Sequence, residues 1–429
     1  MLRLGSELLD KAFNALLNYP LCDRCLGRLF ARHGLELSNA ERGRALKTLI
    51  AMSVHKALSS GEEVDSGSLL RLADNGGSPI ADVVQRYIGG VNVRKCFICG
   101  SNLDSIISEL VVKALEALVG REFKSLLVGV EKGSSYEVRE GEVTASLNID
   151  SWESIRREVK REVGKRLQLL TGSTPSFRNP DVLLVLNLET LEVRASSAQL
   201  FLRGRYVKVG RFISQRWWYL RDGAFRYRAS VEGVAERVAS LFKCRDVLIH
   251  AAGREDVDAR MLGDGRPLMI EIVDPLRREV SIEAINNFLR DDWVRVAVHS
   301  TASIKELHEL KRSRNPKIYR VVIYTPTGLT EKDLKSVEAG LEGVEILQRT
   351  PRRILRRKKD VLRRRKVLQT RGRWLSEYLA ELVIKCEGGL YVKELVTGDE
   401  GRTHPSVSSL LGREVEVLFL DVLEFVGNT

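Results

Sequence analysis

Residues 253 to 263 read Gly253-Arg254-Glu255-Asp256-Val257-Asp258-Ala259-Arg260-Met261-Leu262-Gly263, and they are the most informative stretch of the chain. They follow a strand-like apolar run, Val247 to His250, and two alanines. Charged side chains are thus concentrated between two glycines, on a loop that leaves a buried strand. An adjacent Arg lowers the pKa of a carboxyl group and fixes it by charge-assisted hydrogen bonds, so this loop can hold an ionised Asp in a pocket. The alternative is a charged turn with an exposed ion pair.

The whole chain has the composition of a soluble globular protein. It contains 429 residues, of which 44% are hydrophobic and 29% charged, and this length predicts two to four domains. No apolar run approaches the length of a membrane span, and the first residues lack the long apolar region of a signal peptide. We therefore expect a cytoplasmic protein with no membrane partner.

Positive charge is concentrated in one segment. The net charge of the chain is +12, and the segment from Arg352 to Arg373 holds twelve Lys or Arg against one acid, Asp360, so it carries +11 by itself. Such a density is costly to hold together unless a polyanion neutralises it, and a phosphate backbone is the usual one. The segment therefore predicts nucleic-acid binding, and the alternative is a solvated helix face.

Four of the six cysteines form two C-x-x-C pairs. This spacing lets two thiolates reach one tetrahedral ion. Because about seventy residues separate the pairs, a helical insertion must bring them together. Two disulfides or a redox motif are the alternatives, but a cytoplasmic chain disfavours the first and the second needs only one pair. We predict a structural Zn²⁺ with four ligands: Cys22, Cys25, Cys96 and Cys99.

The apolar pattern predicts an α+β chain in three parts. Residues 1–100 form a helical region with both cysteine pairs, and residues 101–215 alternate helix and strand. Residues 216–429 combine helices with a mixed, mainly antiparallel sheet. Towards the end of the middle part, a hairpin is followed by the G-R-Y-x-K strand from Gly204 to Lys208. This order resembles the end of a THUMP domain, an RNA-binding α/β module, and its basic and aromatic residues suit RNA.

Four sequence segments of the last part are considered together: 253–267, 317–320, 348–353 and 388–394. The last of them is followed by the run T-G-D-E-G-R-T-H-P-S. With the two cysteine pairs and the THUMP-like middle part, nearly the whole chain resembles the archaeal and eukaryotic tRNA pseudouridine synthases of the Pus-ten family. The resemblance implies a pseudouridine synthase catalytic domain at 216–429 that modifies uridine 54, uridine 55 or both in the tRNA T loop. It also implies the T arm of tRNA as partner, and a monomer.

The resemblance assigns the charged residues of the site. The catalytic residue of this superfamily is an Asp in a G-R-x-D motif, which corresponds to Asp256 here. Arg254 would pair with it, and Lys393 would be the second cation near it. Asp258, placed in a strand-like register, would point the other way.

The resemblance also assigns two aromatic residues that bind the substrate. Tyr319, in Lys-x-Tyr, would stack on the target base and take part in proton transfer. Tyr391 would lie beneath the base, on a strand running from Leu390 to Val396. Taken alone, each tyrosine is more typical of a core residue.

The chemistry fits these residue types. Isomerisation breaks the N1–C1′ bond, rotates the base and joins C5 to C1′, so no catalytic cofactor is required. The reaction needs an ionised carboxylate and a target nucleobase that no longer stacks on its neighbours. A THUMP-bearing tRNA methyltransferase would need a glycine-rich loop, and a thiolase would need a pyrophosphatase-type loop. Neither motif can be recognised in the sequence. A non-catalytic tRNA-binding factor remains open, and it predicts that Asp256→Ala keeps full function.

Overall fold

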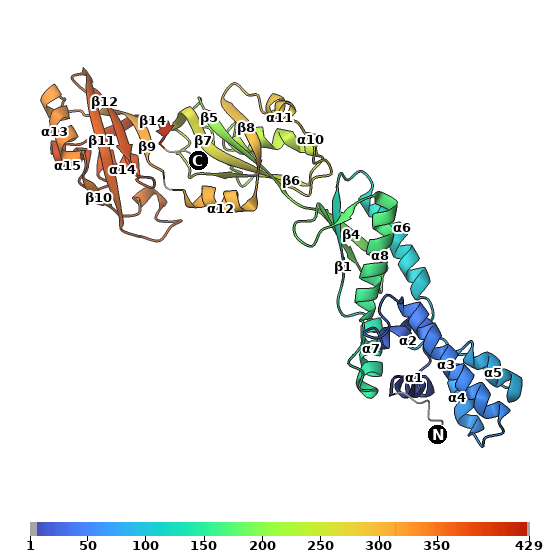
Figure 1. Ribbon diagram of the computed structural model, residues 1–429. Helices are drawn as coiled ribbons and strands as arrows, with labels where there is room; N and C mark the ends of the chain where they lie inside the picture. The colour runs from blue at the N-terminus through green and yellow to red at the C-terminus, as the bar shows by residue number, and fades with distance from the viewer. Residues whose placement is uncertain (1–6, 314, 427–429) are drawn as a thin grey trace. The chain divides into compact units, whose positions relative to one another are not determined.

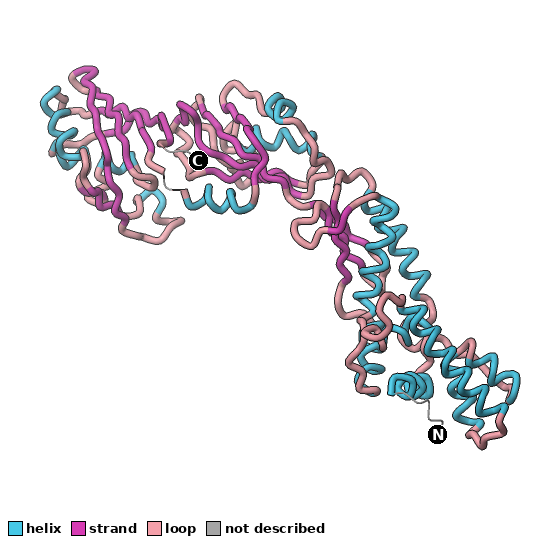
Figure 2. The backbone as a smooth tube through the Cα atoms, in the orientation of Figure 1, coloured by secondary structure: helices cyan, strands magenta, loops and turns pink. Residues whose placement is uncertain are grey.

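The computed structural model describes residues 7–313 and 315–426. The chain divides into two compact units, Met1–Ala198 and Gln199–Thr429. Both units contain helices and strands (Figure 2), as the predicted α+β class requires. In the described part of the chain, no helix combines the length and the apolar character that crossing a membrane would demand.

The first unit joins a helical region to a small sheet. The sheet has the order β2-β1-β3-β4, in which β1 pairs in parallel with β2 and β3, and β3 and β4 form the predicted hairpin. Helices α6 and α8 lie beside this sheet (Figure 1). The elements are α1 (Glu7–Asn18), α2 (Asp23–Leu29), α3 (Asn39–Ser59), α4 (Ser66–Gly76), α5 (Ile80–Tyr87), α6 (Leu103–Leu118), β1 (Ser125–Val130), α7 (Ser135–Ser146), α8 (Ile155–Thr171), β2 (Thr174–Pro175), β3 (Val182–Leu186) and β4 (Val193–Ser197).

Local sequence explains where the helices of this unit begin and end. Helix α6 buries Ile107, Leu110 and Ala114, whose spacing of three to four residues places them on one face. Helix α8 begins after Ser154, whose side chain accepts a hydrogen bond from a backbone amide of the first turn. It ends at Gly172, which adopts the left-handed conformation.

The second unit is built on one ten-stranded sheet. Its order is β13-β10-β11-β12-β9-β14-β7-β5-β8, with β6 also paired to β7. Among the described strands of this sheet, only β14 and β7 pair in parallel, so the sheet is mixed and mainly antiparallel, as predicted. The elements are β5 (Leu200–Lys208), α9 (Val231–Ala235), η1 (Glu236–Val238), α10 (Ala239–Phe242), β6 (Asp246–Ala251), β7 (Arg260–Val273), α11 (Ile282–Phe288), β8 (Val294–Ala302), α12 (Ile304–Arg312), β9 (Lys317–Tyr324), α13 (Glu331–Leu341), β10 (Glu345–Gln348), η2 (Arg352–Ile354), β11 (Arg363–Ser376), β12 (Leu379–Cys386), α14 (Val392–Thr397), β13 (Thr403–His404), α15 (Val407–Leu411) and β14 (Glu416–Phe425).

The G-R-Y-x-K strand lies in this second sheet. It forms the second half of β5, which pairs antiparallel with β7 and β8. Assigning it to the RNA-binding part from its local sequence was therefore wrong. Phe201, Leu202 and Tyr206 are buried in the core of the second unit, and Gly204 is required because a Cβ there would lie 2.2 Å from a carbonyl oxygen of β8.

One further prediction about the second unit needs correction, and one alternative is excluded. The expected strand from Leu390 to Val396 is helix α14, because its buried residues Val392, Leu395 and Val396 share one helical face. The basic segment is not a helix face either. It comprises the short turn η2, an exposed loop and the first part of β11.

Candidate active site and metal site

The carboxylate of Asp256 lies in a charged cluster of the second unit. Its loop connects β6 to β7 and turns at Gly253, where φ is +85°, a conformation that favours glycine. Asp256 Oδ1 accepts a hydrogen bond from Arg353 Nη1 at 2.9 Å, and Oδ2 lies 3.5 Å from Lys393 Nζ. The side chain is 30% exposed. The carboxylate thus faces two cations while one side remains open to solvent.

The first of these cations differs from the expected one. Arg254, which the resemblance pairs with the Asp, is exposed. In the described part of the chain, the ion pairs of Asp256 come from Arg353 and Lys393. Arg353 belongs to the Q-R-T-P-R-R segment that contributes to the family resemblance, so a signal for it was present, but nothing in the sequence connected it with the Asp.

Asp258 shares Lys393 with Asp256. Lys393 Nζ donates to Asp258 Oδ1 at 2.8 Å and to Oδ2 at 2.6 Å. Burial raises the pKa of Asp258, but the hydrogen bond and charge of Lys393 outweigh it and hold that pKa below its usual value. The expectation that Asp258 points the other way was wrong, because residues 257–258 form a turn rather than a strand.

Helix α14 supplies the residues that orient the cations. Lys393 lies in its first turn, and the adjacent buried Glu394 accepts a hydrogen bond from Arg353 Nε at 2.6 Å. Arg353 is therefore held between Glu394 and Asp256. Partial burial would lower the pKa of this guanidinium, but the two carboxylates raise it above its ordinary value.

The two predicted tyrosines occupy different settings. Tyr319, on β9, is partly buried between the two hydrophobic clusters of the unit. Burial is the main cause that raises the pKa of its phenol well above the usual range, and negative charges that include Asp256 add to this shift. Tyr391 precedes α14, and its ring centre lies 5.5 Å from the guanidinium carbon of Arg363. It therefore packs against the basic segment and does not lie on a strand.

The four predicted metal ligands converge in the first unit. The sulfur atoms of Cys22, Cys25, Cys96 and Cys99 all lie within 4.8 Å of one another, and all four thiols are free. The Cys22 and Cys99 sulfurs are 3.6 Å apart. Zn–S bonds of about 2.3 Å in a tetrahedron separate sulfur atoms by about 3.8 Å, whereas a disulfide would require about 2 Å. The cluster fits one tetrahedral metal ion and does not fit two disulfides.

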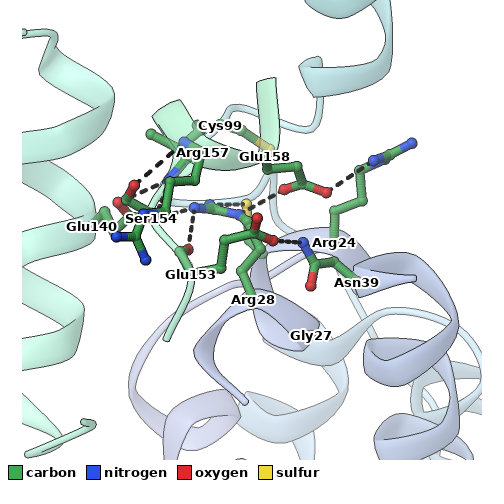
Figure 3. Close-up of polar contacts among 12 residues, drawn as sticks. Arg24, Gly27, Arg28, Asn39, Cys99, Glu140, Glu153, Ser154, Arg157 and Glu158 are labelled. Carbon is green, nitrogen blue, oxygen red and sulfur yellow. Dashed lines mark hydrogen bonds and ion pairs between the residues drawn. The ribbon is translucent and has the colours of Figure 1, made fainter. Parts of the chain in front are cut away.

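A buried arginine supports the cysteine cluster (Figure 3). Arg28 Nη2 donates to Cys25 Sγ at 3.2 Å, and Arg28 Nε lies 2.9 Å from Glu158 of α8. Arg28 also pairs with Glu140 of α7. The guanidinium offsets negative charge on the thiolates, and it ties the cysteine cluster to helices α7 and α8.

Comparisons with known proteins give the same family for both units of the chain. Residues 201–425 match the family described as "Pus10, C-terminal", and residues 110–187 match "Pus10 THUMP domain, archaeal". The chain is 41% identical to the tRNA pseudouridine synthase Pus10 of Thermosphaera aggregans, covering 97% of this chain and 96% of that protein. It is 38% identical to the same enzyme of Ignisphaera aggregans, covering 97% and 98%. A solved Cbf5-Nop10-Gar1 complex is similar at 13% identity and a TM-score of 0.29, over 52% of this chain and 58% of that one.

Proposed function

Because the chain belongs to the Pus10 family of tRNA pseudouridine synthases, we propose that it modifies uridine 54, uridine 55 or both in the T loop, with Asp256 as the catalytic carboxylate. The observation that supports this assignment is the setting of Asp256. It is a partly exposed carboxylate held by two cations, Arg353 and Lys393. A protein that only binds RNA has no need for such a carboxylate among its cations.

The proposed mechanism gives each of these side chains a task. The Asp256 carboxylate attacks the sugar carbon or assists removal of a proton while the N1–C1′ bond breaks and the C5–C1′ bond forms. The proton on C5 is lost to solvent, and N1, freed from C1′, takes up a proton, so the product is an isomer of uridine. Lys393 and Arg353 orient the carboxylate through charge-assisted bonds that leave one side open. The ring of Tyr319 retains the detached base while it rotates, and the base reaches the site by leaving its stack.

The cysteine cluster is proposed to hold a structural Zn²⁺. The donor set of four thiolates suits zinc, and a site with four protein ligands leaves no open position for substrate. The ion would therefore stabilise the fold of the first unit. The chemistry at Asp256 needs nothing from it.

The proposal is tested by two measurements on unmodified tRNA transcripts. The first is tritium release from C5-labelled uridine, which reports C5–C1′ bond formation. The second is mapping of pseudouridine in transcripts that carry cytidine in place of uridine 54 or uridine 55. We expect release from the unchanged transcript and loss of product at the replaced position only. Full release from a transcript that carries both replacements would refute the T-loop assignment.

The basic loop after η2 is expected to grip the tRNA backbone. Lys358 and Lys359 are exposed, so replacing both by Gln should weaken tRNA binding and leave the fold intact. Removing two phosphate contacts should lower the slope of log affinity against log salt by about 1.4 to 1.8. Filter binding at several salt concentrations measures this slope. The matched control, Lys332→Gln with Lys335→Gln on the exposed face of α13, should leave it unchanged, and an equal drop in both variants would contradict the prediction.

A further inference from the structure

The segment that follows the G-R-Y motif contacts the backbone of the Asp256 loop. Lys208 Nζ donates to the carbonyl oxygen of Asp256 at 3.1 Å. The Phe212 amide donates to that of Val257 at 2.7 Å, and Arg211 Nη1 donates to that of Asp258, also at 2.7 Å. Three consecutive carbonyls of the loop are therefore bound by one short segment, residues 208–212.

The start of the loop is held in the same way. Arg266 Nη1 donates to the carbonyl oxygen of Ala252 at 2.7 Å, and Gln215 Nε2 donates to that of Gly253 at 3.1 Å. The loop itself lies between β6 and β7 and is not part of a strand, so it has no strand-to-strand hydrogen bonds. Donors from outside the loop therefore hold its path, together with the turn in which the Ala259 amide donates to the Asp256 carbonyl.

A buried charge cluster fixes these donors. Glu255, next to Asp256 in the chain, is 2% exposed and lies 3.3 Å from Lys208 Nζ. Arg266 Nε donates to it at 2.9 Å, and the hydroxyl of Tyr206 donates at 2.8 Å. Charges removed from water in this way are tolerated only when their geometry is well satisfied. The cluster therefore ties Glu255 of the loop to strands β5 and β7.

Arg211 also connects the loop to the strand beside Tyr319. Its Nη1 donates to the Leu420 carbonyl at 2.9 Å, and its Nη2 donates to Asp421 Oδ1 at 2.7 Å. Both residues lie on β14, where Val422 is paired with Tyr319 of β9. One guanidinium thus fixes the spacing between the Asp256 loop and the strand pair that carries the tyrosine.

We propose that Lys208 and Arg211 are positioning residues for the isomerisation, and that they act by holding the backbone carbonyls of the Asp256 loop. The inference rests on the proposed catalytic role of Asp256. Neither residue needs to touch the substrate. Because misplacing a reacting group by about 1 Å can cost about 100-fold in rate, loosening the loop lowers the rate of the chemical step and leaves tRNA binding unchanged.

The test compares two arginines that bind the same carboxylate. Arg260 also holds Asp421, with bonds of 2.8 and 2.7 Å, but within the described residues its side chain donates to no carbonyl of the loop. Arg211→Lys and Arg260→Lys are each purified as the full chain, and their melting temperatures, tRNA dissociation constants and single-turnover rates are measured. Both variants should lose similar stability and keep wild-type tRNA affinity. Only Arg211→Lys should lower the rate, by about 10- to 100-fold.

Equal rates for the two arginine variants would overturn the inference, because the effect would then follow from the shared contact with Asp421. Lys208→Met should lower the rate by about 100-fold. Because Lys208 is fully buried, this variant can fail to fold. The test therefore relies on Arg211→Lys. Asp256→Asn is assayed in parallel. If Asp256→Asn stays active, the proposed catalytic role fails; if it is inactive while Arg211→Lys matches wild type, only the positioning inference fails.

Discussion

Replacing Asp256 by Asn should lower the single-turnover rate of pseudouridine formation by at least about 10⁴-fold, with tRNA affinity unchanged. The amide keeps the size of the side chain and an oxygen that can accept from Arg353, which donates to Asp256 at 2.9 Å. It loses the negative charge needed to attack the sugar or assist proton removal. Tritium release measured with enzyme in excess over tRNA isolates this step from product release.

Asp258→Asn is the matched control for that experiment. Asp258 stands two residues away, shares Lys393 and is the more exposed of the two carboxylates. Its short bonds to Lys393 make it a partner of the cation, so its loss should cost only about tenfold, through a less well oriented Lys393. Full activity of Asp256→Asn together with an inactive Asp258→Asn would transfer the catalytic role to Asp258.

Removing the metal should unfold the helical part of the first unit. Binding of a structural zinc ion by four thiolates contributes on the order of 10 kcal/mol to small domains. Without the ion, Cys25, Cys96 and Cys99 are buried thiols packed against one another, and Arg28 loses the charge that it offsets at Cys25. Cys96→Ser should therefore lower the metal content from about one ion per chain to near zero and strongly destabilise this region.

The measurements are elemental analysis of the purified protein and limited proteolysis of residues 1–198. Cys244→Ser is the control, since Cys244 is half-buried in the second unit and stands outside the cluster. It should retain the metal and the wild-type cleavage pattern. A Cys96→Ser protein with full metal content, or one without metal that resists protease as wild type does, would show that the cluster does not hold a structural ion.

Local sequence determined much of the architecture. The helix at Leu103–Leu118 and the strand at Lys317–Tyr324 follow from local sequence, because the spacing of buried residues is a property of each segment alone. The cysteine cluster was also predictable, since two C-x-x-C pairs together supply the four ligands of one tetrahedral ion. Long, specific motifs likewise identified the family.

The tertiary structure alone decided which groups surround Asp256. Arg353 is 97 residues away along the chain, and Lys208, 48 residues away, belongs to a motif that local sequence assigned to a different part. Arg254, the nearest cation in sequence, is exposed and forms no ion pair with Asp256 among the described residues. The physical reason is that an ion pair depends on distance in space, which sheet pairing between remote strands determines. Sequence by itself thus specified the family, the local elements and the candidate carboxylate, whereas folding of the second unit selected the cations and carbonyl contacts that hold it.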